Sequence, residues 1–281
     1  MDPTEAKREE HDTWMRMAPG FGRHQELLRR CGAPVSERML DRCRVGPGNR
    51  ALDIACGAGD PALLAAERVG PTGSVLAIDF AEEMVAVARK EAERTGRANV
   101  DFRVADGETL DVPAGAFDAV TLRFGLMFMP EPLACLRGAW RALRPGGRIA
   151  VACWAPQERN PWWTLAGNIV RRHTGLPPPV PGEPGAFRFA DPEVLRATLE
   201  AAGFGGVEID DVEIAFGPYA DPEAWWQTML DLRGAAVVLL ETLPAATRAA
   251  ATREILDAAA AQMKPGGIVL GGAAWVASGR K

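Results

Sequence analysis

Two sets of residues have the types and the spacing to hold an adenosine group. Gly57 and Gly59 follow the apolar run 51–55, and they permit a tight turn in which backbone N–H groups come close to a ligand. Asp79 ends a second apolar run about twenty residues further on. A carboxylate at the end of such a strand can accept hydrogen bonds from both ribose hydroxyls of an adenosine.

Two classes of protein combine a glycine turn with an acid at this spacing. Nicotinamide dehydrogenases do so, and Gly57-x-Gly59-x-x-Ala62 fits their glycine pattern. Methyltransferases that use S-adenosylmethionine (SAM) do so as well. The glycine motif does not separate the two classes, and an ordinary structural turn is a third interpretation of it.

These residues require parallel strands whose carboxyl ends share one edge of a sheet. The turn should lead into a helix capped by Asp60, with Pro61 at its first position. Five further apolar runs predict strands, and the segments between them have the composition of helices. The strands are expected at 100–104, 117–122, 148–154, 207–216 and 268–278, and the helices at 81–95, 133–143, 191–202 and 239–263. This alternation predicts a doubly wound α/β sheet.

The N-terminal part is expected to be helical in pieces. Pro19 and Gly20 should break a helix within residues 4–30, and a short helix is expected over 36–43. The proline-rich segment 176–185 should be an extended loop.

Composition limits the function classes. The chain has 281 residues and a net charge of −5, which argues against a nucleic-acid-binding protein. No apolar run approaches the roughly 20 residues of a membrane span. The polar N-terminus lacks the apolar region of a signal peptide, and the five cysteines show no CxxC spacing. We therefore expect a cytoplasmic protein of one large domain with reduced thiols, without a metal site or a membrane partner.

Five blocks in order resemble the class I SAM-dependent methyltransferases. The blocks are LDIACGAGDPALLAA, VLAIDFAEEMVAVAR, FRVADGETLDVP, FDAVTLRFGLMFMPEP and ALRPGGRIAVACW, and they cover roughly residues 45–155. They are most similar to the small-molecule branch that contains quinone-biosynthesis C-methyltransferases and natural-product methyltransferases of secondary metabolism. No His-containing constellation for hydride transfer accompanies them, which disfavours the dehydrogenase.

The resemblance implies SAM as cofactor, S-adenosylhomocysteine (SAH) as product, and a set of cofactor-binding residues. The methionine part is assigned to the first motif, the ribose to Asp79, the adenine to Met84, Asp106 and Gly107, and the neighbourhood of the methyl group to the end of the fourth strand. The implied cofactor residues are Asp53, Ala55, Cys56, Gly57, Gly59, Asp79, Phe80, Met84, Asp106, Gly107, Glu108, Arg123 and Phe124. The sequence departs from the family pattern where Asp60-Pro61 replaces the third glycine.

The resemblance also implies a seven-stranded, mostly parallel, Rossmann-like sheet whose last strand is antiparallel, covered by a helical cap. The expected division is an N-terminal helical flap (1–44), a SAM-binding core (45–155), a cap segment (156–190), a core helix and strand (191–218), a helical cap excursion (219–263) and a final core strand (264–281).

The sequence offers few candidate bases. Among three histidines and one tyrosine, His24, His173 and Tyr219 are weak candidates, and a solvated histidine is the simpler interpretation of both histidines. The catalytic residues therefore stay open.

All eight tryptophans lie outside residues 45–139, so the cofactor-binding segment uses none. We expect an aromatic pocket for a mostly apolar acceptor such as a polyketide, quinol, terpenoid or lipid, although the same rings would also serve to pack the cap on the sheet. The candidate pocket residues are Trp14, Met17, Phe21, Phe128, Trp154, Trp162, Trp163, Tyr219, Trp225 and Trp226. Methylation of O, C or N, a monomer or a homodimer, and a SAM-binding cyclase, decarboxylase or structural partner that transfers no methyl group all stay open.

Overall fold

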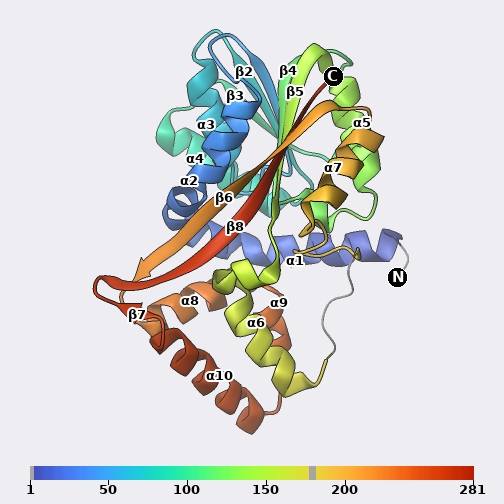
Figure 1. The fold of residues 1–281 in the computed structure, drawn as a ribbon. Coiled ribbons are helices and arrows are strands. Elements are labelled where there is room, and N and C mark those ends of the chain that lie inside the picture. The colour runs from blue at the N-terminus through green and yellow to red at the C-terminus, as the bar shows by residue number, and fades with distance from the viewer. Residues whose placement is uncertain (1–2, 177–181) are drawn as a thin grey trace.

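One twisted sheet organises the chain, for which a computed structural model describes residues 3–176 and 182–281 (Figure 1). Its strands are β1 (Arg50–Ile54), β2 (Ser74–Asp79), β3 (Val100–Val104), β4 (Phe117–Arg123), β5 (Leu143–Trp154), β6 (Gly205–Tyr219), β7 (Met263–Lys264) and β8 (Gly267–Arg280). Their order is β3-β2-β1-β4-β5-β8-β6, and the short β7 pairs with β8.

The strand directions confirm the predicted fold. β1 to β5 pair in parallel, whereas β8 is antiparallel to both of its long neighbours, β5 and β6. The seven long strands therefore form a mostly parallel sheet whose last strand in the chain runs the opposite way. The five parallel strands end at one edge, where a doubly wound sheet binds its ligands.

Helices cover both faces of the sheet and one of its edges (Figure 1). One face carries α2 (Gln25–Arg42), α3 (Asp60–Val69) and α4 (Glu82–Thr95), and the other carries α5 (Pro132–Ala142) and α7 (Pro192–Ala201). α1 (Pro3–Arg23) crosses the edge at which the parallel strands end. Beyond it lie α6 (Pro161–Thr174), α8 (Pro222–Leu232), α9 (Ala235–Glu241) and α10 (Ala245–Ala260), which we call the cap helices. Short 3-10 turns occupy Gly107–Thr109, Leu126–Phe128 and Gln157–Arg159.

The predicted break at Pro19 and Gly20 is wrong, because α1 runs through both residues. α1 packs against α4 and α8, and a Cβ on Gly20 would lie 2.0 Å from the Asp231 carbonyl oxygen of α8. Gly20 thus permits a close approach of two helices instead of ending one. Tertiary packing outweighs the low helix propensity of the Pro-Gly pair.

Two further expectations need correction. The helix expected over 36–43 begins at Gln25, and it contains Gly32 and Pro34. α3 is capped by Gly59 in the left-handed conformation, with φ of 95°, so Asp60 is the first helical residue and not the cap. Of the predicted loop at 176–185, residues 177–181 lie outside the described residues.

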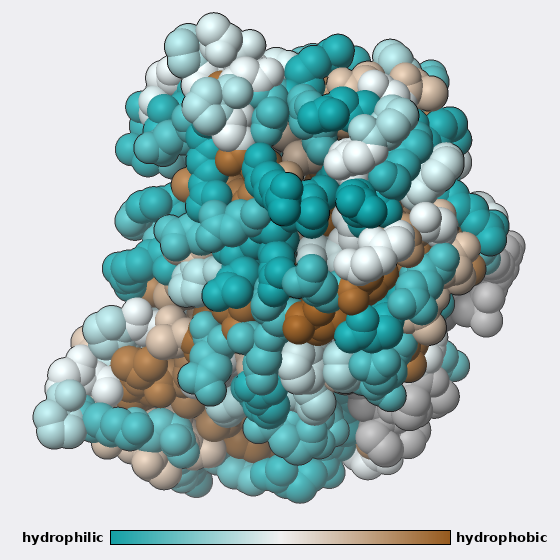
Figure 2. Space-filling view, turned by 45° about the horizontal axis from the view of Figure 1, so that its top comes forward, coloured by the Kyte–Doolittle hydropathy of each residue, from teal (hydrophilic) through white to brown (hydrophobic). Residues whose placement is uncertain are grey.

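Hydrophobic groups are few on the surface beside the two long antiparallel strands. Figure 2 shows a mostly hydrophilic face there, with hydrophobic patches mainly toward the end that carries the cap helices. No helix within the described residues is long and apolar enough to cross a membrane.

Candidate cofactor and acceptor site

The turn after β1 is bonded to the end of β2. The Gly57 N–H donates to Asp79 Oδ2 at 2.8 Å, and the Ala81 N–H donates to Asp79 Oδ1 at 3.0 Å. Ala55 has φ of 55°, in the left-handed region that residues other than glycine rarely adopt. Such conformations concentrate at functional sites, and here the strained residue starts the glycine turn.

Asp79 has the geometry expected of a ribose-binding acid. It is 6% exposed, and burial raises its pKa while backbone N–H groups of Ala81, Gly57 and Phe80 oppose that rise. The Gly57 and Ala81 N–H groups donate to different carboxylate oxygens. Each oxygen has a second lone pair, and two accepting oxygens fit the two ribose hydroxyls of an adenosine.

A second acidic pair lies beside the end of β3. The Glu108 N–H donates to Asp106 Oδ1 at 2.9 Å, and Lys7 Nζ of α1 lies 2.5 Å from Asp106 Oδ2. Lys7 also pairs with Glu108. A Cβ on Gly107 would lie 2.7 Å from the Ile54 side chain, so glycine is needed for this turn to approach β1.

Asp53 is a buried acid below the glycine turn. Thr121 Oγ1 donates to Asp53 Oδ1 at 2.7 Å, while Asp53 Oδ2 has no partner among the described residues. Burial raises the pKa of Asp53 to about 7. Asp53 does not line the cavity described below.

Arg123, at the end of β4, is held by two polar partners. Its Nη1 lies 2.5 Å from Asp60 Oδ2 and 2.9 Å from Ser36 Oγ. A Cβ on Gly32 would lie 2.4 Å from the same nitrogen, so the glycine of α2 makes room for the guanidinium. Asp60, which stands where the family pattern has a third glycine, thus pairs with Arg123.

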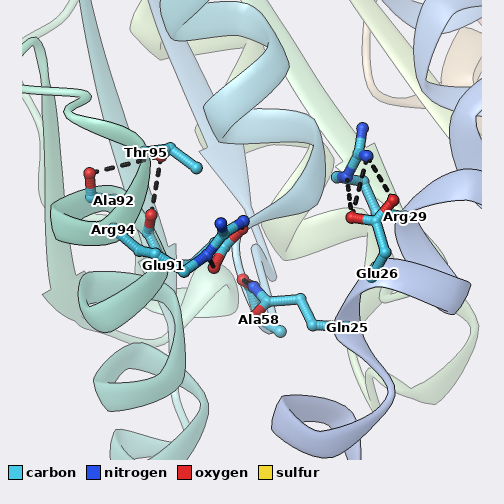
Figure 3. Close-up of polar contacts among 8 residues, drawn as sticks. All are labelled: Gln25, Glu26, Arg29, Ala58, Glu91, Ala92, Arg94 and Thr95. Carbon is cyan, nitrogen blue, oxygen red and sulfur yellow. Dashed lines mark hydrogen bonds and ion pairs between the residues drawn. The ribbon is translucent and has the colours of Figure 1, made fainter.

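α2 is tied to the glycine turn by one side chain. Gln25 Nε2 donates to the Ala58 carbonyl oxygen at 2.9 Å (Figure 3). The neighbouring guanidinium of Arg29 pairs with Glu26 on the same helix at 2.8 Å. The N-terminal helices therefore contribute directly to the rim of the site.

One cavity joins the acidic edge to an aromatic chamber. Together with the solvent-open space at its mouth, it encloses about 1560 Å³ that no atom fills. Its lining runs from Asp79, Asp106 and Glu108 past Arg123 to the rings of α1, β5 and α6. The same cavity therefore reaches both the acidic end of the sheet and the aromatic rings.

The chamber walls are stacked rings. Phe124 stacks on Trp154 with ring centroids 3.9 Å apart, and Trp162 stacks on Phe216 at 3.9 Å. Trp14 of α1 meets Phe128 edge to face at 5.4 Å. A stacked, largely buried wall is rigid, and it favours a flat or apolar ligand.

Most of the predicted residues meet in this cavity. It is lined by the predicted cofactor residues Ala55, Cys56, Gly57, Asp79, Phe80, Met84, Asp106, Gly107, Glu108, Arg123 and Phe124, and by the predicted pocket residues Trp14, Phe21, Phe128, Trp154, Trp162 and Trp163. Asp53, Gly59, Met17, Tyr219, Trp225 and Trp226 are not part of the lining. Met17 and both residues of the 225–226 pair are buried in packing.

The three weak base candidates are engaged elsewhere. His24 Nε2 lies 2.8 Å from Asp231 Oδ2, and His173 Nε2 lies 2.9 Å from Glu254 Oε2 on the cap helices. The Tyr219 hydroxyl accepts a bond from Trp162 Nε1 at 3.0 Å, and burial raises its pKa to about 12. None of the three lines the cavity.

Sequence reasoning missed several lining residues. Lys7, Glu10, Gln25, Arg29 and Gly32 lie on the N-terminal helices, and Asp60, Ile214, Phe216 and Leu232 come from α3, β6 and α8. Among these missed residues is an acid, Glu10, whose pKa is raised to about 7 by burial. The helical spacing of Lys7, Glu10 and Trp14 is the signal that could have found it.

No three His, Cys, Asp or Glu side chains are grouped to hold a metal ion within residues 3–176 and 182–281. The residues that gather at the sheet edge instead fit an adenosine with a charged tail. Asp79 offers two acceptor sites, Asp106 lies beside a glycine, and the glycine turn presents backbone to the cavity.

Residues 35–160 match the model of the ubiE/COQ5 methyltransferase family. The chain is 34% identical over 236 residues to the nocamycin O-methyltransferase of Saccharothrix syringae, covering 79% of this chain and 82% of that protein. It is 38% identical over 179 residues to the demethylmenaquinone methyltransferase of Thermus thermophilus, covering 59% and 79%.

The fold agrees with a solved putative methyltransferase from Bacillus halodurans, with a TM-score of 0.56, 21% identity, and coverage of 88% of this chain and 98% of that one. Together with the sequence relatives, these findings confirm the resemblance to SAM-dependent methyltransferases and exclude the dehydrogenase that the glycine motif left open. The chain belongs to the ubiE/COQ5 methyltransferase family and is a SAM-dependent methyltransferase that acts on a small molecule.

Proposed function

We propose that this enzyme methylates a hydroxyl oxygen of a mostly apolar small molecule of the natural-product type. The observation that carries the proposal is the single cavity that leads from Asp79 and Asp106 into a chamber walled by Trp154, Trp162 and Phe216. The relative that is named an O-methyltransferase aligns with 79% of the chain, against 59% for the relative that acts on demethylmenaquinone. This difference supports oxygen over ring carbon as the acceptor atom.

The residues of the sheet edge would hold the cofactor. Asp79 would accept both ribose hydroxyls, Asp106 would accept from the adenine amino group, and the turn at Gly57 would face the methionine part. When bound, SAM supplies a methyl group on a positively charged sulfur. The protein then contributes mainly alignment and the exclusion of water, because the leaving group is already activated.

The aromatic chamber would hold the acceptor against the end of β4. Phe124 has φ of 57° and stacks on Trp154, so its ring is fixed where the cofactor and acceptor parts of the cavity meet. A fixed wall reduces the freedom of a flat acceptor before the reaction. It would therefore raise the fraction of bound molecules in the reactive orientation.

Calorimetric titration with SAM, SAH and NAD tests the cofactor part of the proposal. We expect binding of SAM and SAH but not of NAD, and at least a 100-fold loss of SAM affinity in Asp79→Asn, because charged hydrogen bonds contribute about 1.5–3 kcal/mol each. A thermal melt of Asp79→Asn must show a folded protein. Unchanged SAM affinity in that folded variant would contradict the role of Asp79.

SAH formation with a panel of naphthols, dihydroxynaphthalenes and hydroxyanthraquinones tests the acceptor part. Trp163→Ala should raise the acceptor KM and leave the SAM affinity unchanged, since Trp163 lines the chamber. Trp140→Ala is the control, because Trp140 is 37% exposed and lies outside the cavity lining. Products with the methyl group on ring carbon would favour the quinol alternative, and SAM binding without any SAH would favour a protein that transfers no methyl group.

A further inference from the structure

α1 presents one row of side chains to the cavity. Lys7, Glu10, Trp14 and Phe21 all line it, and their spacing of three, four and seven residues places them on one face of the helix. Lys7 reaches Asp106 at one end of the cavity, and Trp14 meets Phe128 in the aromatic chamber. Glu10 lies between Lys7 and Trp14 along this face of the helix.

Five carboxylates line the cavity, and four of them have strong partners. Asp60 pairs with Arg123, Asp79 accepts two backbone N–H bonds, and Asp106 and Glu108 share Lys7. Glu10 is the exception. It accepts a hydrogen bond from the Trp14 side chain, and no ion pair to it occurs within the described residues.

The other titratable groups of the lining are poor proton acceptors. Arg29 is paired with Glu26, and the Arg123 guanidinium is paired with Asp60. Burial raises the pKa of the Cys56 thiol well above its usual range, so the thiolate is scarce. No histidine or tyrosine belongs to the described lining. Glu10 is therefore the remaining group that can take up a proton.

The surroundings of Glu10 suit that role. Burial raises its pKa to about 7, the Trp14 hydrogen bond opposes the rise, and the neighbouring charge of Glu9 adds to it. The other charged groups of the lining are Lys7 on the same helix, Arg29 on α2, the Asp60–Arg123 pair, and Asp79, Asp106 and Glu108 at the sheet edge. Lys7 is turned toward the acids of the sheet edge, so the described structure gives Glu10 no neutralising cation. A carboxylate whose pKa lies near the working pH can take a proton and release it again.

We propose that Glu10 is the catalytic base that accepts the proton of the acceptor hydroxyl during methyl transfer, an inference that rests on the O-methylation proposed above. The O–H bond breaks and its proton moves to a carboxylate oxygen of Glu10. The freed electron pair on the acceptor oxygen forms the bond to the methyl carbon, and the electrons of the C–S bond go to sulfur, which leaves as neutral SAH. The protonated Glu10 then returns its proton to water.

The test compares Glu10→Gln with the unchanged enzyme. With 1-naphthol we expect kcat to fall at least 100-fold, the lower end of the usual contribution of a general base. The SAM affinity should change less than threefold. With 4-nitro-1-naphthol, which is already ionised at the assay pH, the loss of kcat should be below tenfold because no proton has to be removed.

The pH profile gives a readout that a structural role would not move. The rate of the unchanged enzyme with 1-naphthol should rise with pH and level off above about 7, and Glu10→Gln should lose this rise. Glu9→Gln is the matched control, because Glu9 is a neighbouring exposed acid on the same helix. It removes the same charge and should keep both the rate and the rise.

Each outcome decides between the two proposals. Full activity of a folded Glu10→Gln with 1-naphthol overturns the role of Glu10 and leaves O-methylation intact. Equal losses with both naphthols also overturn it, because they indicate a positional effect. Absence of SAH from the unchanged enzyme with every acceptor of the panel, despite SAM binding, overturns the proposed function on which the inference rests.

Discussion

The substitution Asp53→Asn should remove the part of the pH dependence of stability that arises from this acid. Burial raises the pKa of Asp53 from 3.8 to about 7, so the folded state holds a proton that the unfolded state has released. The unfolded state binds fewer protons between these values, and stability therefore falls as the pH rises from about 4 to about 7. Above both pKa values the penalty is constant.

The size of the effect follows from the shift. Each pKa unit corresponds to about 1.4 kcal/mol, so from pH 5 to pH 8 Asp53 should remove about 3 kcal/mol from the free energy of unfolding. Asn cannot ionise, and its carbonyl oxygen can still accept the Thr121 bond. Its amide N–H₂ would stand where Asp53 Oδ2 has no partner, which costs about 1–3 kcal/mol at every pH.

Urea unfolding, followed by tryptophan fluorescence at pH 5, 6, 7 and 8, measures this effect. The free energy of unfolding of Asp53→Asn relative to the unchanged protein should improve by about 3 kcal/mol across that range. The slope of the free energy against urea concentration should be the same for both proteins. Asp101→Asn is the control, because the Asp101 side chain is 57% exposed and its variant should show a flat difference. A flat difference for Asp53→Asn would refute the reasoning that burial outweighs the Thr121 hydrogen bond and the Arg123 charge in setting the pKa of this acid.

Two further predictions concern how the site is assembled. Lys7→Met removes both ion pairs that hold α1 to the acids of the sheet edge, so hydrogen exchange over residues 3–14 should become faster. Global stability should fall by less than about 1 kcal/mol because the pairs are partly exposed. Unchanged exchange would mean that apolar contacts alone hold the helix. Gly125→Ala places a Cβ 2.5 Å from the Ala55 Cβ and should cost about 1–3 kcal/mol in urea unfolding, whereas Gly46→Ala meets nothing within 4 Å and should be neutral. Equal stability of the two variants would show that the turn after β1 shifts to accommodate the added methyl group without a loss of stability.

Local sequence signals were sufficient for the sheet. The strand runs and the glycine turn specify buried parallel strands, since only strands covered on both faces are apolar throughout. Asp79 was predicted from its place at one strand end, and it lines the cavity. These features are set by residues close together in the chain.

The N-terminal helices show why the rest was missed. In the sequence alone, glycine at positions 20 and 32 suggests a helix break. In the folded chain, Gly20 lets α8 approach closely and Gly32 makes room for Arg123. Glu10 looks like one more charge in a polar helix. Its burial depends on the rings and strand ends that α1 crosses, and no local pattern encodes that environment.

The long antiparallel pair of β6 and β8 carries an inserted helical segment beyond the parallel sheet. The pairing of β5 with β8 ends at Trp154 and Ala274, while β6 and β8 continue together to Tyr219 and Ile268. α8, α9 and α10 are inserted between these two strands, beyond the parallel sheet (Figure 1). From this inserted segment Leu232 lines the cavity, and the Asp231 backbone meets Gly20 of α1. Substitutions in α8 should therefore alter the cavity both directly and through α1, which carries Lys7, Glu10 and Trp14.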